Sequence, residues 1–278
     1  KNTTYFHECN KERWRVVKPN ILLEDGSFSG DRDVIGSLDF SFFKNLFSDP
    51  NPNMVRGYPC GNAVLFEGIP NMLSDFDNNL LDAIPSEGEI HDSMMRLNPE
   101  SAPGPDGFPG AFYRGPWEIV KDDVIFSIQD FFRGGYIPRV VGATTLVMLP
   151  KIKNLSSICD FRPVSICNFP YKILSSIINS RLSVLVSRCI SLEQHGLVRG
   201  RSIQVTVALA HEMIRDINIK CHGLNMALNM DMNKAYDRME CGIIIRVLKG
   251  MGFSSWVIEI LFHCFSYSWM SVSYMGKT

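Results

Sequence analysis

Residues 98–110 divide the chain into two differently patterned parts. Their sequence, NPESAPGPDGFPG, holds four prolines and three glycines. Neither a helix nor a central strand can include this stretch, because proline lacks the backbone N–H that both elements need and glycine weakens them. The segment is therefore either a linker or a loop that other parts of the chain hold in place.

The part before this segment is expected to be mainly helical. Residues 33–49 carry an apolar stripe at helical spacing, and residues 71–97 contain two short helices. The second of these helices is expected to begin after Ser86, because Glu89, three residues later, can complete a capping box. Residues 8–28 are expected to form a charged helix, a strand and a turn.

The part after this segment alternates helices and strands, which predicts an α+β arrangement. Amphipathic patterns and glycine stops predict helices over residues 116–135, 171–190, 202–220, 241–253 and 254–265. Apolar, β-branched or alternating runs predict strands over residues 143–151, 224–232 and 268–278.

Charge is distributed unevenly along the chain, although the net charge is only −1. Residues 1–100 hold 9 Lys and Arg against 16 Asp and Glu, whereas residues 101–278 hold 19 against 13. Residues 151–220 alone hold 10 against 4. This basic segment indicates an anionic partner, with nucleic acid as the first candidate, although a solvated basic surface explains the charge equally well.

The eight cysteines contain no Cys-x-x-Cys pair, which favours reduced thiols in an intracellular protein over disulfides or a zinc site. No run of about 18 apolar residues is present, so no membrane span is expected. The chain begins without a methionine, and both of its ends fall within apparent elements. We therefore expect it to be a piece of a longer protein.

The predicted strand over residues 224–232, LNMALNMDM, carries Asp231 near its end. An aspartate in this position is well placed to bind a hard cation such as Mg²⁺, which proteins usually hold with one or two carboxylates and substrate phosphates. An aspartate that merely caps the following helix gives the same pattern.

Five segments occur in a fixed order along the chain: SAPGPDGF, LVMLPK, DFRPVSICNFPYKILSSIINSRL, EQHGLVRGRSI and LNMDMNKAYDRMEC. Together they resemble the reverse transcriptase of plant non-LTR (LINE-type) retrotransposons, and the resemblance covers almost the whole chain. NTTYFH near the start is similar to a stretch in the connector between the endonuclease and the polymerase of that family. The ordered set is specific, whereas any single motif is not.

The resemblance implies a role for several individual residues. Asp231 matches the first catalytic aspartate, which binds both metal ions, and the backbone carbonyl of Met232 would contact one of them. Tyr236 matches the aromatic residue that excludes ribonucleotides. Lys151 of LPK and Arg162 of FRP match the fingers cations that hold the incoming triphosphate, for which a lysine point charge and an arginine fork are suited.

Four further residues match the family segment that lies along the template strand: Gln194, Gly200, Arg201 and Ser202. The segment departs from the family pattern at Leu197, where an aromatic residue is usual. We therefore expect the departure to alter how the template packs against this segment.

The resemblance also implies the fold, a right-hand polymerase of α+β class. Residues 1–97 would form a mainly helical connector, residues 98–222 the fingers, and residues 223–278 the beginning of the palm, truncated before the rest of the palm and the thumb. The implied partners are an RNA template, a DNA primer and deoxynucleoside triphosphates, with no membrane. Mg²⁺ or Mn²⁺ is expected only for a complete site.

The remaining metal-binding carboxylates of the family, an adjacent Asp pair on a hairpin, would lie beyond Thr278. Two-metal phosphoryl transfer needs them. We therefore expect an RNA-directed DNA polymerase by descent that is inactive as these 278 residues. Asp122-Asp123 does not supply the pair, because it lies upstream within a helical pattern, where a helix would splay the two carboxylates apart.

Several patterns also have plainer interpretations. Lys151 and Arg162 could be ordinary strand-edge and loop charges. The HEM sequence at 211–213 is followed by Arg215, where a zinc protease would need histidine, so a metalloprotease is excluded. Other interpretations of the whole chain are a catalytically dead RNA-binding module, a non-functional element remnant and, among enzymes, a group II intron maturase.

Overall fold

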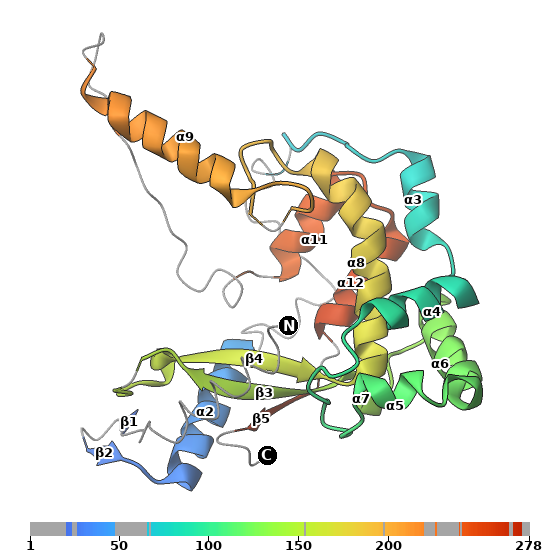
Figure 1. Cartoon of the computed structure of the whole chain (residues 1–278), viewed down its shortest axis with the longest axis horizontal. Coiled ribbons are helices and arrows are strands. Elements are labelled where there is room, and N and C mark those ends of the chain that lie inside the picture. The colour runs from blue at the N-terminus through green and yellow to red at the C-terminus, as the bar shows by residue number, and fades with distance from the viewer. Residues whose placement is uncertain are drawn as a thin grey trace. The chain divides into compact units, whose positions relative to one another are not determined.

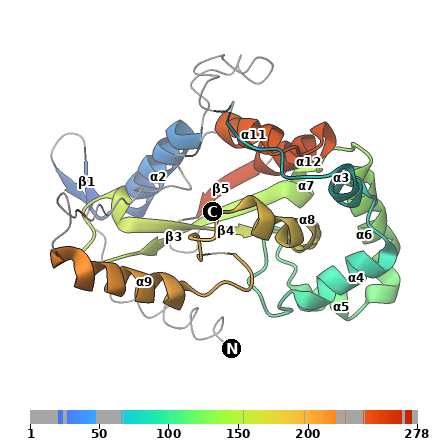
Figure 2. The same cartoon turned by 90° about the horizontal axis from the view of Figure 1, so that it is seen from above.

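The computed structural model describes residues 21–23, 27–47, 66, 68–152, 154–196, 198–219, 226, 239, 241–266 and 269–273. The chain divides into two compact units, each built from separate stretches of sequence (Figures 1 and 2). One unit combines Lys1–Pro59, Ile84–Ile177 and Ile260–Thr278, and the other combines Cys60–Ala83 and Ile178–Glu259. The domain boundaries predicted after residues 97 and 222 stay a prediction.

A three-stranded sheet lies in the first unit. It consists of β3 (Ala143–Pro150), β4 (Phe161–Cys167) and β5 (Trp269–Ser273), in the order β4-β3-β5. β4 runs antiparallel to β3, and β5 runs parallel to it. The strand predicted over residues 143–151 is thus confirmed, and the strand predicted over residues 268–278 is confirmed over its described part, residues 269–273.

The strand β4 was not predicted. Pro163 lies within it and cannot donate a backbone hydrogen bond, which argues against a central strand. The structure resolves the conflict by placing β4 at the edge of the sheet, where one side of the strand needs no partner strand. Arg162 thus lies on an edge strand and not in a loop.

Helix α2 (Arg32–Phe47) packs on one face of the sheet, as the apolar stripe over residues 33–49 predicts. The shared core contains Ile35 and Phe43 from the helix and Leu146, Met148 and Phe161 from β3 and β4. The short strands β1 (Ile21–Leu22) and β2 (Phe28–Ser29) form a second, antiparallel sheet whose Ile21 joins the same core.

Asp39 lies in the buried stripe of α2, one helical turn from both Ile35 and Phe43. Within the part of the chain that the structure describes, neither carboxylate oxygen has a hydrogen-bond partner. Burial raises the pKa of Asp39 to about 7, because the charged form loses its hydration. This carboxyl group therefore changes its protonation near neutral pH.

The first unit also holds the helices on either side of the segment 98–110 and those that flank the sheet strands in sequence. They are α4 (Glu87–Arg96), α5 (Gly110–Arg114), α6 (Trp117–Phe132), α7 (Arg139–Gly142), the beginning of α8 (Phe169–Cys189) and the end of α12 (Ser255–Ser266). Ser86 caps α4 as predicted, because its hydroxyl accepts a hydrogen bond from the backbone of Glu89 at 3.2 Å. The predicted helices over residues 116–135 and 171–190 are confirmed.

The second unit contains α3 (Asp75–Asp82), the end of α8, α9 (Ile203–Arg215), α11 (Cys241–Gly250) and the beginning of α12 (Ser255–Ser266). Two short 3₁₀ helices, η3 (Ile158–Asp160) in the first unit and η4 (Asp216–Asn218) in the second, complete the elements. The predicted helices over residues 202–220, 241–253 and 254–265 are confirmed, although α9 ends earlier than expected.

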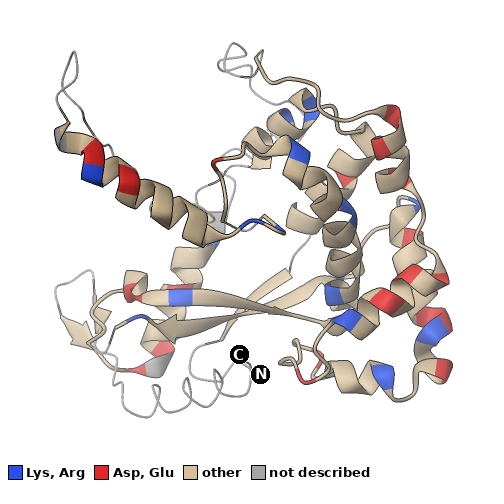
Figure 3. Cartoon of the chain, turned by 45° about the horizontal axis from the view of Figure 1, so that its top comes forward, with Lys and Arg blue, Asp and Glu red and all other residues tan. Residues whose placement is uncertain are grey.

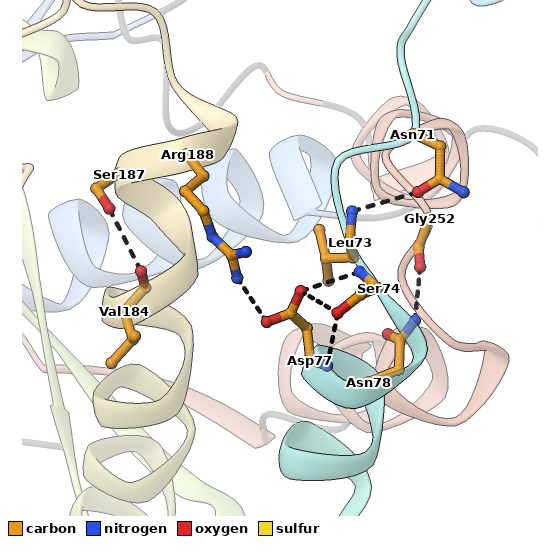
Figure 4. A network of polar contacts seen from close by, with 9 residues as sticks. All are labelled: Asn71, Leu73, Ser74, Asp77, Asn78, Val184, Ser187, Arg188 and Gly252. Carbon is orange, nitrogen blue, oxygen red and sulfur yellow. Dashed lines mark hydrogen bonds and ion pairs between the residues drawn. The ribbon is translucent and has the colours of Figure 1, made fainter.

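A polar network joins α3, the end of α8 and the turn before α12 (Figure 4). Asp77 forms a capping box with Ser74 and an ion pair with Arg188 at 2.5 Å. The Asn78 amide donates to the Gly252 carbonyl at 2.8 Å. Hydrogen bonds to Arg188 and Ser74 lower the pKa of Asp77 to about 2.

The predicted strand over residues 224–232 and the predicted helix at the start of the chain lie outside the described residues, apart from single positions.

No helix among the described residues is long and apolar enough to span a membrane.

Candidate nucleotide and nucleic-acid interface

The proline- and glycine-rich segment 98–110 is held by the beginning of α8. Asn168 is 2% exposed, and its side-chain oxygen accepts a hydrogen bond from the backbone N–H of Asp106 at 3.1 Å. The amide nitrogen of Asn168 donates to the carbonyl of Val140. The Lys172 ammonium donates to the Ala102 carbonyl at 2.7 Å. Of the two alternatives left by the sequence, the segment is thus a fixed loop and not a linker.

Glycine is required at two positions of this loop by close packing. A Cβ on Gly104 would lie 2.1 Å from the side-chain oxygen of Asn168 and 2.5 Å from its backbone nitrogen. A Cβ on Gly110 would lie 2.5 Å from the ring of Phe169. Gly104 and Gly110 therefore pack so closely against Asn168 and Phe169 that no side chain fits at either glycine.

Asn168 and Lys172 were not singled out in the sequence, although both lie in the recognised stretch CNFPYK. Burial lowers the pKa of Lys172, and this effect is opposed by the nearby Cys167 and Asp106. Burial also raises the pKa of the Cys167 thiol. Lys172 thus serves mainly to fix backbone. A buried polar residue directly after a strand is the signal that could have marked Asn168.

Lys151 directly follows β3, and Arg162 is the second residue of the neighbouring strand β4. Arg162 is opposite Leu149 in the ladder, and the backbone N–H of Lys151 extends the ladder by donating to Asp160 at 2.8 Å. Residues opposite each other in a ladder point to the same face, and side chains alternate along each strand. Pro150 and Phe161, which pair between them, are buried, so both cations belong to the opposite face of the sheet.

Both cations are exposed, but their contacts differ. The Lys151 ammonium donates to the carbonyl of Cys159 at 2.9 Å, which draws the side chain over the turn between β3 and β4. Arg162 has no hydrogen bond or ion pair among the described residues. The donors of the Arg162 guanidinium are therefore available to a ligand. The Lys151 ammonium would have to give up its hydrogen bond to the Cys159 carbonyl in order to bind the same ligand.

Asp160 fixes the turn that begins at Lys151. Its carboxylate accepts hydrogen bonds from the backbone N–H groups of Ser156 at 3.0 Å and Ser157 at 2.9 Å. These hydrogen bonds, that of Ser156 above all, lower the pKa of Asp160, and the charge of Lys151 adds to the effect. The turn is thus fixed by a charged carboxylate that also stabilises the neighbouring lysine.

The segment predicted to follow the template lies in the second unit, between α8 and α9. Both terminal nitrogens of the Arg201 guanidinium donate to backbone carbonyls at the end of α8 and in the following turn. The acceptors are Ser187 and Ile190 at 3.0 Å, Gln194 at 2.8 Å, and Ser191. Arg201 therefore binds one carbonyl in the last turn of α8, that of Ser187, and three carbonyls of the turn that follows the helix.

The other three predicted template residues surround this contact. Ser202 caps α9, because its hydroxyl accepts from the backbone N–H of Gln204 at 3.3 Å. Gly200 has a φ of 83°, which glycine adopts without strain. Gln194 is exposed, and its amide donates to the Gly196 carbonyl at 3.3 Å. The structure thus brings all four residues into one short segment.

Three predicted site residues, Asp231, Met232 and Tyr236, lie outside the described residues. No group of three or more His, Cys, Asp or Glu that could hold a metal ion occurs in the described part of the chain. Asp122 and Asp123 are exposed on α6, within a helix as expected.

Residues 150–276 match the family model described as reverse transcriptase (RNA-dependent DNA polymerase). These residues form a reverse transcriptase domain. The match includes Lys151, Arg162 and the segment around Arg201, as well as Asp231. Reverse transcriptases in general use a divalent metal and bind an RNA template, a primer and deoxynucleoside triphosphates.

Two curated relatives extend the similarity beyond this domain. The chain is 27% identical over 91% of its length to a transposon TX1 uncharacterized 149 kDa protein of Xenopus laevis. It is 24% identical over 54% of its length to a retrovirus-related Pol polyprotein from the type-1 retrotransposable element R1 of Bradysia coprophila. The chain spans 19% and 15% of the length of these two relatives. The reverse transcriptase domain is therefore homologous to proteins of non-LTR retrotransposons.

Proposed function

We propose that the reverse transcriptase domain of this chain takes part in RNA-directed DNA synthesis, with Lys151 and Arg162 holding the triphosphate of the incoming deoxynucleotide. The observation that carries the proposal is their register. Two cations, one directly after β3 and one in β4, belong to one face of the sheet, beside a turn that Asp160 fixes. An arginine fork together with a lysine point charge suits a polyphosphate.

Asp231 would supply the carboxylate of this site, and Tyr236 would screen the sugar of the nucleotide. The Asp231 carboxylate and the Met232 carbonyl would hold Mg²⁺ or Mn²⁺, which when bound neutralises phosphate charge during transfer to the primer 3′-hydroxyl. Gln194, Gly200, Arg201 and Ser202 would border the RNA template. Because its guanidinium already binds four carbonyls, Arg201 would act there mainly by fixing the loop.

Calorimetric titration of the full chain with deoxythymidine triphosphate and Mg²⁺ tests the proposal. Lys151→Ala and Arg162→Ala should each weaken binding about tenfold, since a hydrogen bond between charged groups contributes about 1.5–3 kcal/mol. Arg162→Lys should give an intermediate affinity, because it keeps the charge but loses the fork. Arg215→Ala, which removes an exposed cation paired with Asp216, is the control and should leave binding unchanged.

An unchanged affinity in both alanine variants would overturn the assignment of the triphosphate site. Primer extension on an RNA template gives the second readout. In any polypeptide that carries this domain and copies RNA, Asp231→Asn should abolish nucleotide incorporation, because the first metal-binding carboxylate is then lost. Incorporation that persists in this variant would refute the role of Asp231.

A catalytically inactive RNA-binding module is the second candidate function. It is favoured by the charge of residues 131–192, which hold eight Lys and Arg and a single acidic residue, Asp160. Binding through phosphate contacts releases counterions, so the affinity for RNA should fall steeply between low and moderate salt. An affinity that does not respond to salt would contradict this function.

We also propose two finer features that the motif wording supports. The sequences Ala-Pro-Gly-Pro-Asp-Gly-Phe and Lys-Ala-Tyr-Asp-Arg favour a retrotransposon over a group II intron maturase, and the ordered set of motifs favours a plant element of LINE type. The organisation into a connector (1–97), fingers (98–222) and the beginning of a palm (223–278) follows from the same resemblance. Limited proteolysis with cleavage clustered near residues 97 and 222 would support this organisation.

A further inference from the structure

Two ring contacts join the residues before β3 to α12 and to the first residue of β5, all in the first unit. Tyr136 and His263 stack with ring centroids 5.8 Å apart and an interplanar angle of 25°. The guanidinium carbon of Arg139 lies 3.9 Å from the centroid of the Trp269 ring. A cation this close to an aromatic face makes a favourable cation–π contact.

The Arg139–Trp269 pair is open to solvent. Trp269 is 52% exposed, Tyr136 is 69% exposed, and Arg139 is exposed as well. A tryptophan that served only to fasten β5 would gain most by burying its ring. Here the guanidinium covers the ring from close by, and about half of the side chain remains accessible to a ligand.

The pair lies at one end of a sheet that carries no negative charge. The strands β3, β4 and β5, all within the described chain, contain no acidic residue, and Arg162 is their only charge (Figure 3). Arg139 and Arg133 before it add positive charge, and Asp130 is the nearest acidic residue before them in the sequence. A positive surface with an accessible aromatic ring fits single-stranded nucleic acid, whose phosphates need cations and whose bases stack on rings.

Strand register relates this pair to the two cations of the proposed triphosphate site. Trp269 pairs with Ala143, and Arg162 pairs with Leu149 six residues further along β3. The Thr145 and Ser271 hydroxyls lie 3.2 Å apart, which places the alternate residues of β3 and β5 on one face. Trp269 therefore shares its face with Arg162, at a separation of roughly 20 Å along the sheet.

We propose that Arg139 and Trp269 form a stacking site for an unpaired base of a single-stranded nucleic acid that runs along this face of the sheet. The indole stacks on the base, and the guanidinium contacts a neighbouring phosphate. Six stacked nucleotides at about 3.4 Å each would cover the distance to Arg162. The direction of the strand toward Lys151 and Arg162 rests on the proposed function, whereas the stacking site does not.

Fluorescence anisotropy with a labelled oligouridine RNA of about 12 nucleotides, within the usual site sizes, tests the proposal on the full chain. Trp269→Ala should weaken binding about tenfold, because one base–aromatic stack contributes about 1–3 kcal/mol. Trp269→Phe should retain most of the affinity. Arg139→Gln should weaken binding several-fold and should lower the dependence on salt by about one counterion.

Phe126→Ala is the matched aromatic control, because Phe126 is 66% exposed on α6 away from the sheet strands. Arg215→Gln is the control for loss of an exposed cation. Neither should change RNA affinity. An affinity in Trp269→Ala equal to that of the unmodified chain would overturn the proposal.

Crosslinking of the unmodified chain does not depend on how a variant folds. RNA that carries 5-iodouridine should crosslink on irradiation to the peptide containing Trp269, as mapped by mass spectrometry. Crosslinks confined to other peptides would contradict the stacking site. Triphosphate affinity separates this proposal from the proposed function, because Trp269→Ala should leave it unchanged while Lys151→Ala lowers it.

Discussion

The loop 98–110 in the first unit and the loop 190–202 in the second are both irregular, and side chains tie both to α8. They differ in how they are held. Asn168, which fixes the first loop, is 2% exposed, and a Cβ on Gly104 would overlap it. Arg201, which fixes the second loop, is partly exposed, and a Cβ on Gly200 would meet nothing within 4 Å.

This difference separates a rigid loop from an adaptable one. Asn168 is buried and both of its hydrogen bonds are partly buried, so water replaces them less readily when they are lost. The contacts of Arg201 are accessible, so water can replace them at little cost. We infer that the first loop is part of the scaffold, whereas the second loop can change its shape when the proposed template strand binds.

Gly104→Ala should have the largest effect on the first loop. The new methyl group would lie 2.1 Å from the Asn168 side-chain oxygen and 2.6 Å from its backbone Cα, and backbone cannot move aside as a flexible side chain can. We expect a loss of about 3 kcal/mol or more in the free energy of unfolding, at the upper end of the cost of overpacking. Urea denaturation measures this loss.

Gly88→Ala in α4 is the control for this substitution. Its Cβ would lie 3.9 Å from the nearest atom, the Ser86 hydroxyl, and alanine favours a helix by about 0.5–1 kcal/mol over glycine. Stability should therefore rise or stay level. If Gly104→Ala were tolerated equally well, the loop 98–110 would not be rigid.

Asn168→Ala should have the next largest effect. The substitution removes the acceptor for the Asp106 N–H and the donor for the Val140 carbonyl, and it leaves both partners unsatisfied. We expect a loss of about 2 kcal/mol in the free energy of unfolding, measured by urea denaturation. Asn179→Ala, at an exposed position of α8, the helix that begins directly after Asn168, should change stability by less than about 0.5 kcal/mol. A similar small change at both positions would contradict the role of Asn168.

The contrast between these loops was only partly predictable from sequence. Proline and glycine content indicated that residues 98–110 are irregular, and periodicity predicted the helices that flank both loops. The partners of the first loop were not predictable in this way, because Asp106 and Asn168 are 62 residues apart and local patterns carry no information about such contacts. The same limit applies to Lys172 and Ala102, which are 70 residues apart.

The candidate site shows a similar division. Lys151 and Arg162 were identified through the family resemblance, but their common face depends on the β3–β4 register. The strand β4 was not predictable from the local sequence, because Pro163 lies within it. Arg201 was also identified by resemblance, yet only the structure shows that its guanidinium binds backbone carbonyls. Motifs therefore indicated which residues matter, and the fold shows on what each one acts.

Arg201→Ala should have a smaller effect than the changes in the first loop. Its carbonyl partners become accessible to water, so we expect a loss of only about 1 kcal/mol in global stability. Amide hydrogen exchange should instead rise locally over residues 191–202, where the Gln194 and Arg201 N–H groups bond within the turn. Arg201→Lys should restore little protection, because one ammonium cannot bind four carbonyls. Unchanged exchange would show that the loop is held by other contacts.

The smallest effect is expected from Asp77→Asn, and only in acid. Asp77 pairs with Arg188, the residue after Ser187, so α3 supports the same end of α8 that Arg201 binds (Figure 4). The pKa of Asp77 is lowered to about 2 from the usual 3.8 of an aspartate. Its contribution to stability is therefore complete above pH 3.8 and is lost as the pH falls through about 2.

Thermal melting at about pH 5 and about pH 2.5 should therefore differ less in Asp77→Asn than in the unmodified chain. Asp75→Asn, in the first turn of the same helix, is the control and should leave the difference unchanged. If Asp77→Asn also raises hydrogen exchange over residues 191–202 at neutral pH, the second loop depends on two contacts at one helix end. Exchange that rises with Arg201→Ala alone would instead assign the support of this loop to a single arginine.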